Sequence, residues 1–108
     1  MVDAGILLRC RAKLVEIARN HAKIPYSELA KHLGVVNQSV GLYLNPIYED
    51  EIAAGRPDLT LVVVYSETGY GRFNSRGRQA RSIKVDPNNV SDKQAYDAEL
   101  GKVYAHPW

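Results

Sequence analysis

Residues 24–47 read IPYSELAKHLGVVNQSVGLYLNPI, and this stretch decides the fold that the sequence predicts. Pro25 suits the first turn of a helix, because its ring fixes φ and its missing N–H needs no partner there. Gly34 supplies the left-handed residue that ends many helices. Between them, apolar side chains recur at helical spacing on one face: Leu29, Ala30 and Leu33. The first part of the stretch therefore predicts a short helix.

The second part of the same stretch predicts another helix. Asn37 is a good N-cap residue, because its side chain can accept a hydrogen bond from the first helical turn. Val40, Tyr43 and Leu44 then fall on one inner face. Two short helices joined by a tight turn that contains glycine form a helix-turn-helix. An ordinary helical hairpin in a small core is the alternative interpretation.

Length and composition indicate one globular domain. The chain has 108 residues, of which 45% are hydrophobic and 24% are charged. Its single cysteine, Cys10, cannot form an internal disulfide, so an oxidising compartment is not required. No apolar run is long enough to span a membrane, and charges occur too early for a signal peptide. We therefore expect cytoplasmic localisation and no membrane partner.

The N-terminal residues predict a first helix over about residues 4–20. Asp3 is a plausible N-cap, and Cys10 lies within the apolar stripe of this helix. Arginines on either side of Cys10 would lower its pKa if the thiol were exposed. A small buried residue is the interpretation that the stripe favours, because a free cysteine is usually buried.

A third helix is expected after the helix-turn-helix. Asn45 can cap it and Pro46 can begin it, with an end near Ala54. The helix contains an acidic run, Glu49, Asp50 and Glu51. Adjacent helical positions face different directions and no histidine or cysteine is near, so a metal site is not expected. The run predicts a solvated acidic face.

The second half of the chain predicts a β-hairpin followed by a helix. Residues 59–66 (LTLVVVYS) have the composition of a strand, and residues 70–73 are expected to return beside them. Residues 74–81 are basic and contain glycine, which predicts a loop. Residues 82–85 alternate in polarity and favour a further short strand, and DPNN forms a turn.

The last expected helix begins at a capping box formed by Ser91 and Gln94 and runs to about Tyr104. Trp108 is expected to pack as a C-terminal anchor. Four residues of this last helix are expected to face the core: Ala95, Tyr96, Leu100 and Val103. The predicted fold is therefore α+β: a winged helix-turn-helix with an N-terminal helix, a further helix, a β-hairpin wing around residues 66–81 and a C-terminal helix.

Candidate DNA-binding residues lie on the second helix of the helix-turn-helix and in the wing. Asparagine and glutamine can bond adenine edges, and a glycine permits close approach to a backbone. The helix supplies Asn37, Gln38, Ser39 and Gly41. Residues 72–84 contain five basic residues and no acidic one, although the net charge of the chain is only +2: Arg72, Arg76, Arg78, Arg81 and Lys84. Such a cluster attracts phosphates.

Further residues are expected to assist the same interface. Arg9, Lys23 and Lys31 could add positive charge. Tyr70 and Phe73 lie beside the arginines, where they could stack on a base or pack within the hairpin. A solvated basic loop is the alternative interpretation of residues 74–81.

The stretch that decides the fold resembles the DNA-binding segment of the alkylguanine-DNA alkyltransferases. The residues that carry the resemblance are Tyr26, Glu28, Ala30, Gly34, Ser39, Val40, Gly41, Asn45 and Pro46. Residues 68–73 (TGYGRF) are similar to the Gly-rich turn that follows the active site of that family. The resemblance covers less than half of the chain and implies a DNA-binding scaffold.

Two departures from the family pattern separate the scaffold from the chemistry. The family has a Pro-Cys-His-Arg motif between Asn-Pro and the Gly-rich turn, and here neither cysteine nor histidine occurs there. The intercalating arginine of the family corresponds to Gln38. Alkyl transfer is therefore not expected, because the nucleophile is missing.

The remaining sequence offers no catalytic set. Three histidines are scattered without metal-ligand spacing, and the Gly-rich turn lacks the ending of a phosphate loop. We expect no enzyme activity, cofactor or metal. The leading hypothesis is a non-enzymatic module that binds double-stranded DNA. A protein-interaction module that uses Leu42, the acidic helix, Tyr104 and Trp108 is the alternative, and a sensor of modified or damaged bases is a third hypothesis.

Overall fold

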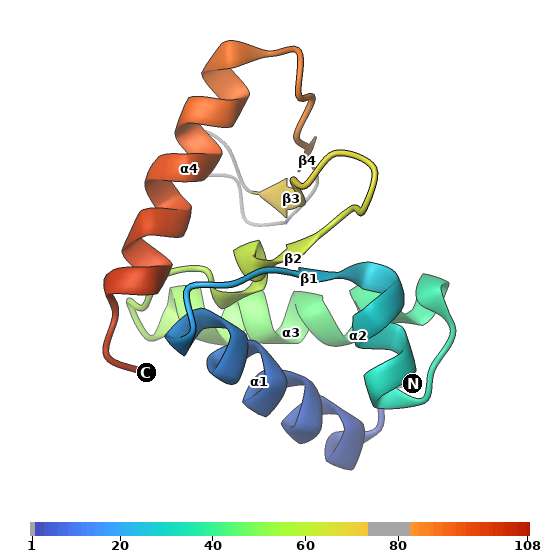
Figure 1. The fold of residues 1–108 in the computed structure, drawn as a ribbon. Helices are drawn as coiled ribbons and strands as arrows, with labels where there is room; N and C mark the ends of the chain where they lie inside the picture. Colours follow the sequence, from blue (N-terminus) through green and yellow to red (C-terminus); the bar gives the residue numbers. More distant parts are fainter. Residues whose placement is uncertain (1, 74–82) are drawn as a thin grey trace.

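The computed structural model describes residues 2–73 and 83–108, and in this part the chain is a mostly helical α+β protein (Figure 1). Four α-helices occur in this part: α1 (Ala4–Arg19), α2 (Tyr26–Leu33), α3 (Val40–Ala53) and α4 (Val90–Ala105). Four short strands accompany them: β1 (Ile24–Pro25), β2 (Val63–Val64), β3 (Arg72–Phe73) and β4 (Ile83–Lys84). None of the helices in this part is long and apolar enough to cross a bilayer.

Helix α1 confirms the prediction for the N-terminal residues. The carboxylate of Asp3 accepts a hydrogen bond from the amide of Ile6 at 3.0 Å and caps the first turn. The helix ends at Arg19, and His21, just beyond the C-cap Asn20, has a φ of 51° in the left-handed region. The side chain of Cys10 is fully buried, as its place in the apolar stripe indicates. Helix α1 thus presents one apolar face to the core.

Helix α2 also has the predicted limits. Gly34 ends it with φ 72°, and the amide of Val35 donates to the carbonyl of Ala30 at 3.0 Å. The predicted capping role of Asn37 is wrong. Residues Asn37–Ser39 form a 3-10 turn, η1, in which the amide of Ser39 donates to the carbonyl of Val36. The backbone closes this turn, and the Asn37 side chain is left exposed.

Helix α3 continues through Pro46, so the predicted break between a second and a third helix is wrong. A proline inside a helix costs about 3 kcal/mol, because it removes one backbone hydrogen bond and crowds the preceding turn. The apolar face on either side of Pro46 is continuous and offsets this cost through burial. Its buried members are Val40, Tyr43, Leu44, Ile47 and Tyr48. The second and third expected helices are therefore one helix, Val40–Ala53.

The predicted long strand over residues 59–66 is largely a different structure. Leu59–Val62 form a second 3-10 turn, η2, which Asp58 caps by accepting from the amide of Thr60 at 3.0 Å. Strand β2 then pairs in parallel with β1, with Ile24 opposite Val63 and Pro25 opposite Val64. Residues 59–64 are all buried. The apolar run therefore packs into the core on several sides and does not form one long strand.

The hairpin also pairs differently from the prediction. Strand β3 pairs antiparallel with β4, with Arg72 opposite Lys84, and among the described residues β3 forms no strand pairing with residues 59–66. The turn between residues 65 and 70 is closed by a hydrogen bond in which the amide of Tyr65 donates to the carbonyl of Tyr70 at 2.8 Å. The expected short strand over residues 82–85 is thus present, and its partner is Arg72–Phe73.

Helix α4 begins one residue earlier than predicted, and the capping box is wrong. Asn89 caps the helix by accepting from the amide of Asp92 at 3.1 Å. Ala95 is exposed, whereas the other three residues predicted to face inward are buried. Trp108 confirms its predicted role as an anchor: its indole N–H donates to the carbonyl of Val103 at 2.8 Å. Helix α4 rises along one side of the molecule (Figure 1).

Glu51 corrects the prediction of a solvated acidic face. Its side chain is fully buried, and its two carboxylate oxygens pair with different arginines. Arg11 from α1 lies 3.0 Å from Oε1, and Arg56 donates to Oε2. The ion pair with Glu51 raises the pKa of Arg56. Because Glu51 and Arg11 are 40 residues apart, their pair joins the end of α3 to α1. Glu49 and Asp50 are exposed as predicted.

Candidate nucleic-acid interface

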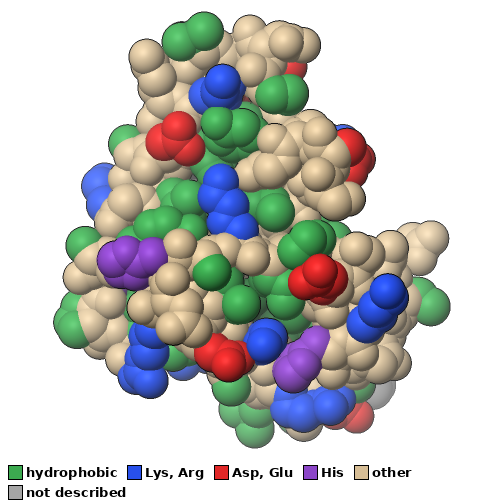
Figure 2. All heavy atoms as spheres, in the orientation of Figure 1, with side chains coloured by type: hydrophobic (Ala, Val, Ile, Leu, Met, Phe, Trp, Pro, Cys, Tyr) green, Lys and Arg blue, Asp and Glu red, His purple; other side chains and the backbone are tan. Residues whose placement is uncertain are grey.

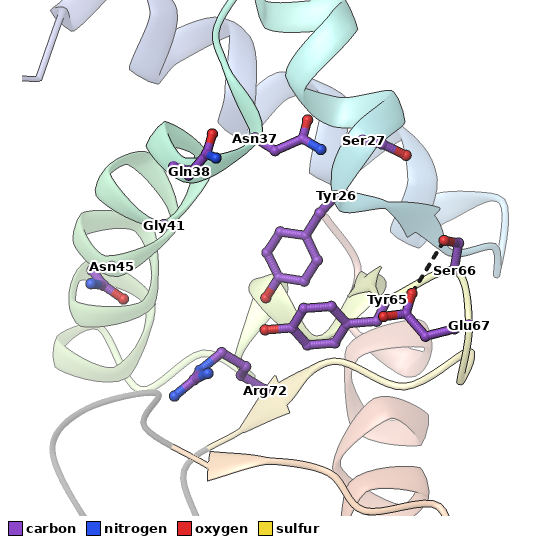
Figure 3. A pocket seen from close by; sticks show the side chains of 10 residues that line it. All are labelled: Tyr26, Ser27, Asn37, Gln38, Gly41, Asn45, Tyr65, Ser66, Glu67 and Arg72. Carbon is purple, nitrogen blue, oxygen red and sulfur yellow. Dashed lines mark hydrogen bonds between the residues drawn. The ribbon is translucent and has the colours of Figure 1, made fainter.

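An open groove of about 610 Å³ lies between α3 and the segment that follows β2 (Figure 3). Its size is within the range of ligand-binding clefts in proteins. The residues that line it come from α2, η1, α3, the segment after β2, and β3: Tyr26, Ser27, Asn37, Gln38, Gly41, Asn45, Tyr65, Ser66, Glu67 and Arg72. Every lining side chain except the glycine carries a hydrogen-bonding group, so the groove offers hydrogen bonds as well as apolar contact.

Helix α3 and the η1 turn form one wall of the groove. Gln38, Gly41 and Asn45 are separated by three and four residues, so they follow one helical face. Gln38 and Asn45 are exposed, and Asn37 precedes them in the same wall. This wall carries three carboxamides and no charge. The glycine between them leaves open space, since a Cβ placed there would meet no atom within 4 Å.

Two tyrosines lie between the walls. The rings of Tyr26 and Tyr65 are 4.7 Å apart at an angle of 34°, and Lys84 Nζ lies 4.2 Å from the Tyr65 ring centroid. Tyr65 therefore has both a ring and a cation against it. In Figure 3 the phenol hydroxyls point toward the side of the groove where Asn45 and Arg72 lie. These tyrosines present hydroxyl groups more than ring faces.

The charged groups of the groove are divided between its ends. The guanidinium of Arg72 points into the groove from β3, opposite α3 (Figure 3). Glu67 lies at another end, where Ser66 Oγ is 3.4 Å from its carboxylate. A phosphate would therefore be attracted to the Arg72 end and repelled from the Glu67 end.

The structure brings together four of the predicted site residues: Asn37, Gln38, Gly41 and Arg72. Lys84 lies beside them through its contact with Tyr65. Ser39 is half-buried and does not line the groove. Arg76, Arg78 and Arg81 lie outside the described residues.

The auxiliary residues have other contacts. Arg9 donates to the carbonyl of Leu33 at 3.1 Å, and Lys23 donates to the carbonyl of Gly69 at 3.0 Å. Tyr70 packs edge-on against Tyr96 and does not line the groove. Lys31 is exposed on α2. These contacts give Arg9, Lys23 and Tyr70 structural roles.

Sequence reasoning missed Asn45, Tyr65 and Tyr26 as groove residues. The spacing of Gln38, Gly41 and Asn45 would have indicated one face, had the helix been extended through Pro46. Tyr26 and Tyr65 are 39 positions apart and meet because β1 and β2 pair in parallel. No local signal in the sequence predicts that meeting.

In the view of Figure 2, basic, acidic and hydrophobic side chains are intermixed. Among residues 2–73 and 83–108, no cluster of histidine, cysteine, aspartate and glutamate could hold a metal ion. The chain matches no protein-family model, no curated protein and no solved structure. The groove geometry itself must therefore carry the functional argument.

Proposed function

We propose that this protein is a non-enzymatic DNA-binding module of winged-helix type. The observation that carries the proposal is the groove in which the carboxamides of η1 and α3 face Arg72 of the β3–β4 hairpin. In this arrangement α2 and α3 serve as the helix-turn-helix, and the hairpin serves as the wing. The order of helices and hairpin along the chain supports this assignment.

Contacts to bases come from α3. Its exposed carboxamides offer a donor and an acceptor each, which suits the edges of base pairs. Gly41 lets the DNA come close to the helix, because no side chain fills the space beside it. The uncharged wall alone would bind DNA weakly, since most of the affinity in such complexes comes from phosphate contacts.

Contacts to phosphates come from the hairpin. Arg72 lines the groove and Lys84 lies opposite it in the strand register. The sequence between these strands contains Arg76, Arg78 and Arg81. Arginine suits this task because its planar guanidinium can donate two parallel hydrogen bonds to a phosphate.

The proposal includes no catalytic activity. One reason lies in the segment that corresponds to the place of the nucleophile in the alkyltransferases, the family that this chain resembles. Here residues 59–64 are buried in η2 and β2, and the hydroxyl of Thr60 is hydrogen-bonded to the carboxylate of Asp58 at 2.5 Å. Cys10 offers no substitute, because burial raises the pKa of its thiol to about 11. A neutral, buried thiol is a poor nucleophile.

One observation favours a second candidate function, a protein-interaction module. Val36 and Leu42 flank the η1 turn, and their side chains are 64% and 52% exposed. Two apolar side chains beside the groove would suit contact with a protein partner. The other residues expected for such a surface are less suitable, because Glu51 is buried and Trp108 is held by α4.

A salt titration of duplex binding tests the first function. Fluorescence anisotropy with labelled plain and alkylated duplexes and with single-stranded DNA should show the tightest binding to duplex. Neutralising about three to five phosphates gives a slope of log K against log salt of roughly −3 to −5. The variant Arg72→Ala should lower the magnitude of this slope by about 1. Lys102→Ala removes the same charge from exposed α4 and is the matched control.

A substitution at Gly41 separates binding from folding. Gly41→Leu adds a good helix-forming side chain where nothing lies within 4 Å, so stability should not fall. The new side chain would occupy the groove, and duplex affinity should fall at least tenfold. Gly101→Leu, on α4, is the control and should bind as wild type does. Unchanged binding by Gly41→Leu would remove the groove from the proposal. The second candidate would be favoured by two results together. The protein would not bind duplex DNA at low salt, and it would bind a defined protein partner that the Leu42→Asp variant no longer binds.

A further inference from the structure

The α3 wall of the groove has a composition that selects among bases. Asn37, Gln38 and Asn45 have exposed side chains. Within the part of the chain that the structure describes, none of these carboxamides donates or accepts a hydrogen bond. Figure 3 shows Gln38 and Asn45 on the side of α3 that carries Gly41, with their polar ends exposed at the groove. Each carboxamide is therefore free to bind a ligand.

The opposite side of the groove makes base stacking an unsuitable mode. Stacking needs an uncovered aromatic face, and Tyr65 has the ring of Tyr26 and the ammonium of Lys84 against it. The tyrosines contribute hydroxyls. A ligand in this groove is consequently recognised by hydrogen bonds to its edges.

We propose that the carboxamide wall reads adenine in A·T base pairs through the major groove of duplex DNA. This inference rests on the proposed function and adds the base that is recognised. Adenine presents an acceptor at N7 beside a donor at N6, and a carboxamide presents the complementary donor and acceptor. Guanine presents two acceptors, N7 and O6, so the carboxamide oxygen would face O6 without a proton between them. Guanine recognition uses arginine or lysine, and this wall carries neither.

The spacing of the carboxamides sets the spacing of the bases. Gln38 lies in η1 and Asn45 lies in α3, seven residues further along the chain. With a rise of about 2.0 Å per residue in the 3-10 turn and about 1.5 Å in the α-helix, the two residues are separated by roughly 11 Å along the wall. Successive base pairs are about 3.4 Å apart along a strand. With α3 lying along the major groove, the two side chains reach adenines about three base pairs apart.

A set of modified duplexes tests the readout. The same duplex is prepared with A·T, G·C or inosine·C pairs at two positions about three base pairs apart, and with 7-deazaadenine in place of adenine at both. The A·T duplex should bind tightest, by about 5- to 150-fold per well-formed bidentate pair. Inosine·C should bind like G·C, because it resembles guanine in the major groove. In the minor groove, by contrast, inosine·C resembles A·T. If the inosine·C duplex bound as tightly as the A·T duplex, readout would be through the minor groove and the proposal would be overturned.

The 7-deazaadenine duplex retains base pairing and the minor-groove edge but lacks the N7 acceptor. It should lose most of the preference for adenine. Equal affinity for all four duplexes, with a steep salt dependence, would overturn the base readout and leave the proposed function intact. Absence of binding to every duplex at low salt would overturn both.

Variants assign the preference to residues. Gln38→Ala and Asn45→Ala should each reduce the ratio of A·T to G·C affinity, with little change in the slope against salt. Gln94→Ala removes an exposed carboxamide from α4 and serves as the matched control. Circular dichroism should show the same fold for all three, because the substituted side chains are exposed. An unchanged affinity ratio in the double variant Gln38→Ala/Asn45→Ala would overturn the assignment.

Discussion

Gly71 lies against the backbone of β2 with no room for a side chain, and we predict that Gly71→Ala is strongly destabilising. A Cβ at this position would lie 2.1 Å from the carbonyl oxygen of Val63 in β2. Ordinary van der Waals contact begins at about 3.4 Å, so one backbone would have to move by more than 1 Å. The contacted atom belongs to the backbone and not to the end of a flexible side chain, so the movement is costly.

The cost has two parts. Overpacking of a well-packed core typically costs about 1–3 kcal/mol. The displacement also strains the hydrogen bond from the amide of Val85 to the carbonyl of Gly71, which measures 3.0 Å, and a lost hydrogen bond costs about 0.5–1.5 kcal/mol. The free energy of unfolding should fall by roughly 2–4 kcal/mol, which corresponds to a fall in Tm of about 10–20 °C.

Urea denaturation followed by circular dichroism gives the measurement, with Gly101→Ala as the control. Gly101 lies in the exposed part of α4, where a Cβ would meet nothing within 4 Å. Alanine there should raise the free energy of unfolding by about 0.5–1 kcal/mol, because glycine is unfavourable inside a helix. The two substitutions thus have opposite signs. A Gly71→Ala variant as stable as wild type would refute the close approach of Gly71 to β2.

Three further measurements address the core. Glu51→Gln should lower the free energy of unfolding in urea by about 2 kcal/mol, below the ~3–5 kcal/mol of a fully buried pair, because Arg11 is partly exposed and water can solvate it. A fall of about 3–5 kcal/mol or more in the free energy of unfolding would contradict this solvation argument. Tyr96→Phe should cost about 1–3 kcal/mol, because it leaves the buried carbonyl of Leu61 without the tyrosine hydroxyl, and thermal unfolding would measure it. Cys10 should resist iodoacetamide at pH 8 until the protein unfolds, as burial raises its pKa from 9.0 to about 11. Since the folded state holds this proton more tightly, stability should fall as the pH rises from about 9 toward 11. Rapid alkylation of the native protein would contradict the burial.

The helices up to Gly34 were predictable because their signals are local. Asp3 caps α1 three residues from the amide that it binds, and Gly34 ends α2 by its own conformation. The apolar stripes identified the buried faces of both helices. These features need no information from distant parts of the chain.

The errors arose where distant packing overrides a local signal. Pro46 indicates a helix start, but the apolar face of α3 continues past it. Glu51 indicates a solvated position, but Arg11 from α1 pairs with it in the core. The apolar run at residues 59–64 indicates a strand, but it is buried on several sides and forms mainly a 3-10 turn. For Glu51 and for the apolar run the deciding partners are far away in the sequence.

The candidate site was predictable on one wall only. Asn37, Gln38 and Gly41 belong to one continuous segment, and their residue types suggested base contacts. Asn45 was missed because it was expected to begin a new helix. The tyrosine pair was missed because it depends on the pairing of β1 with β2.

The parallel pairing of β1 with β2 has a consequence for how the protein folds. Ile24 and Val63 are 39 positions apart, and closing a chain segment of this length costs entropy before any contact offsets it. The groove needs this closure, because Tyr26 and Tyr65 directly follow the two paired strands. The groove is thus assembled only when the non-local core is complete, so a partly folded chain would expose α3 without the surface opposite it. Formation of the groove would then coincide with the global folding transition.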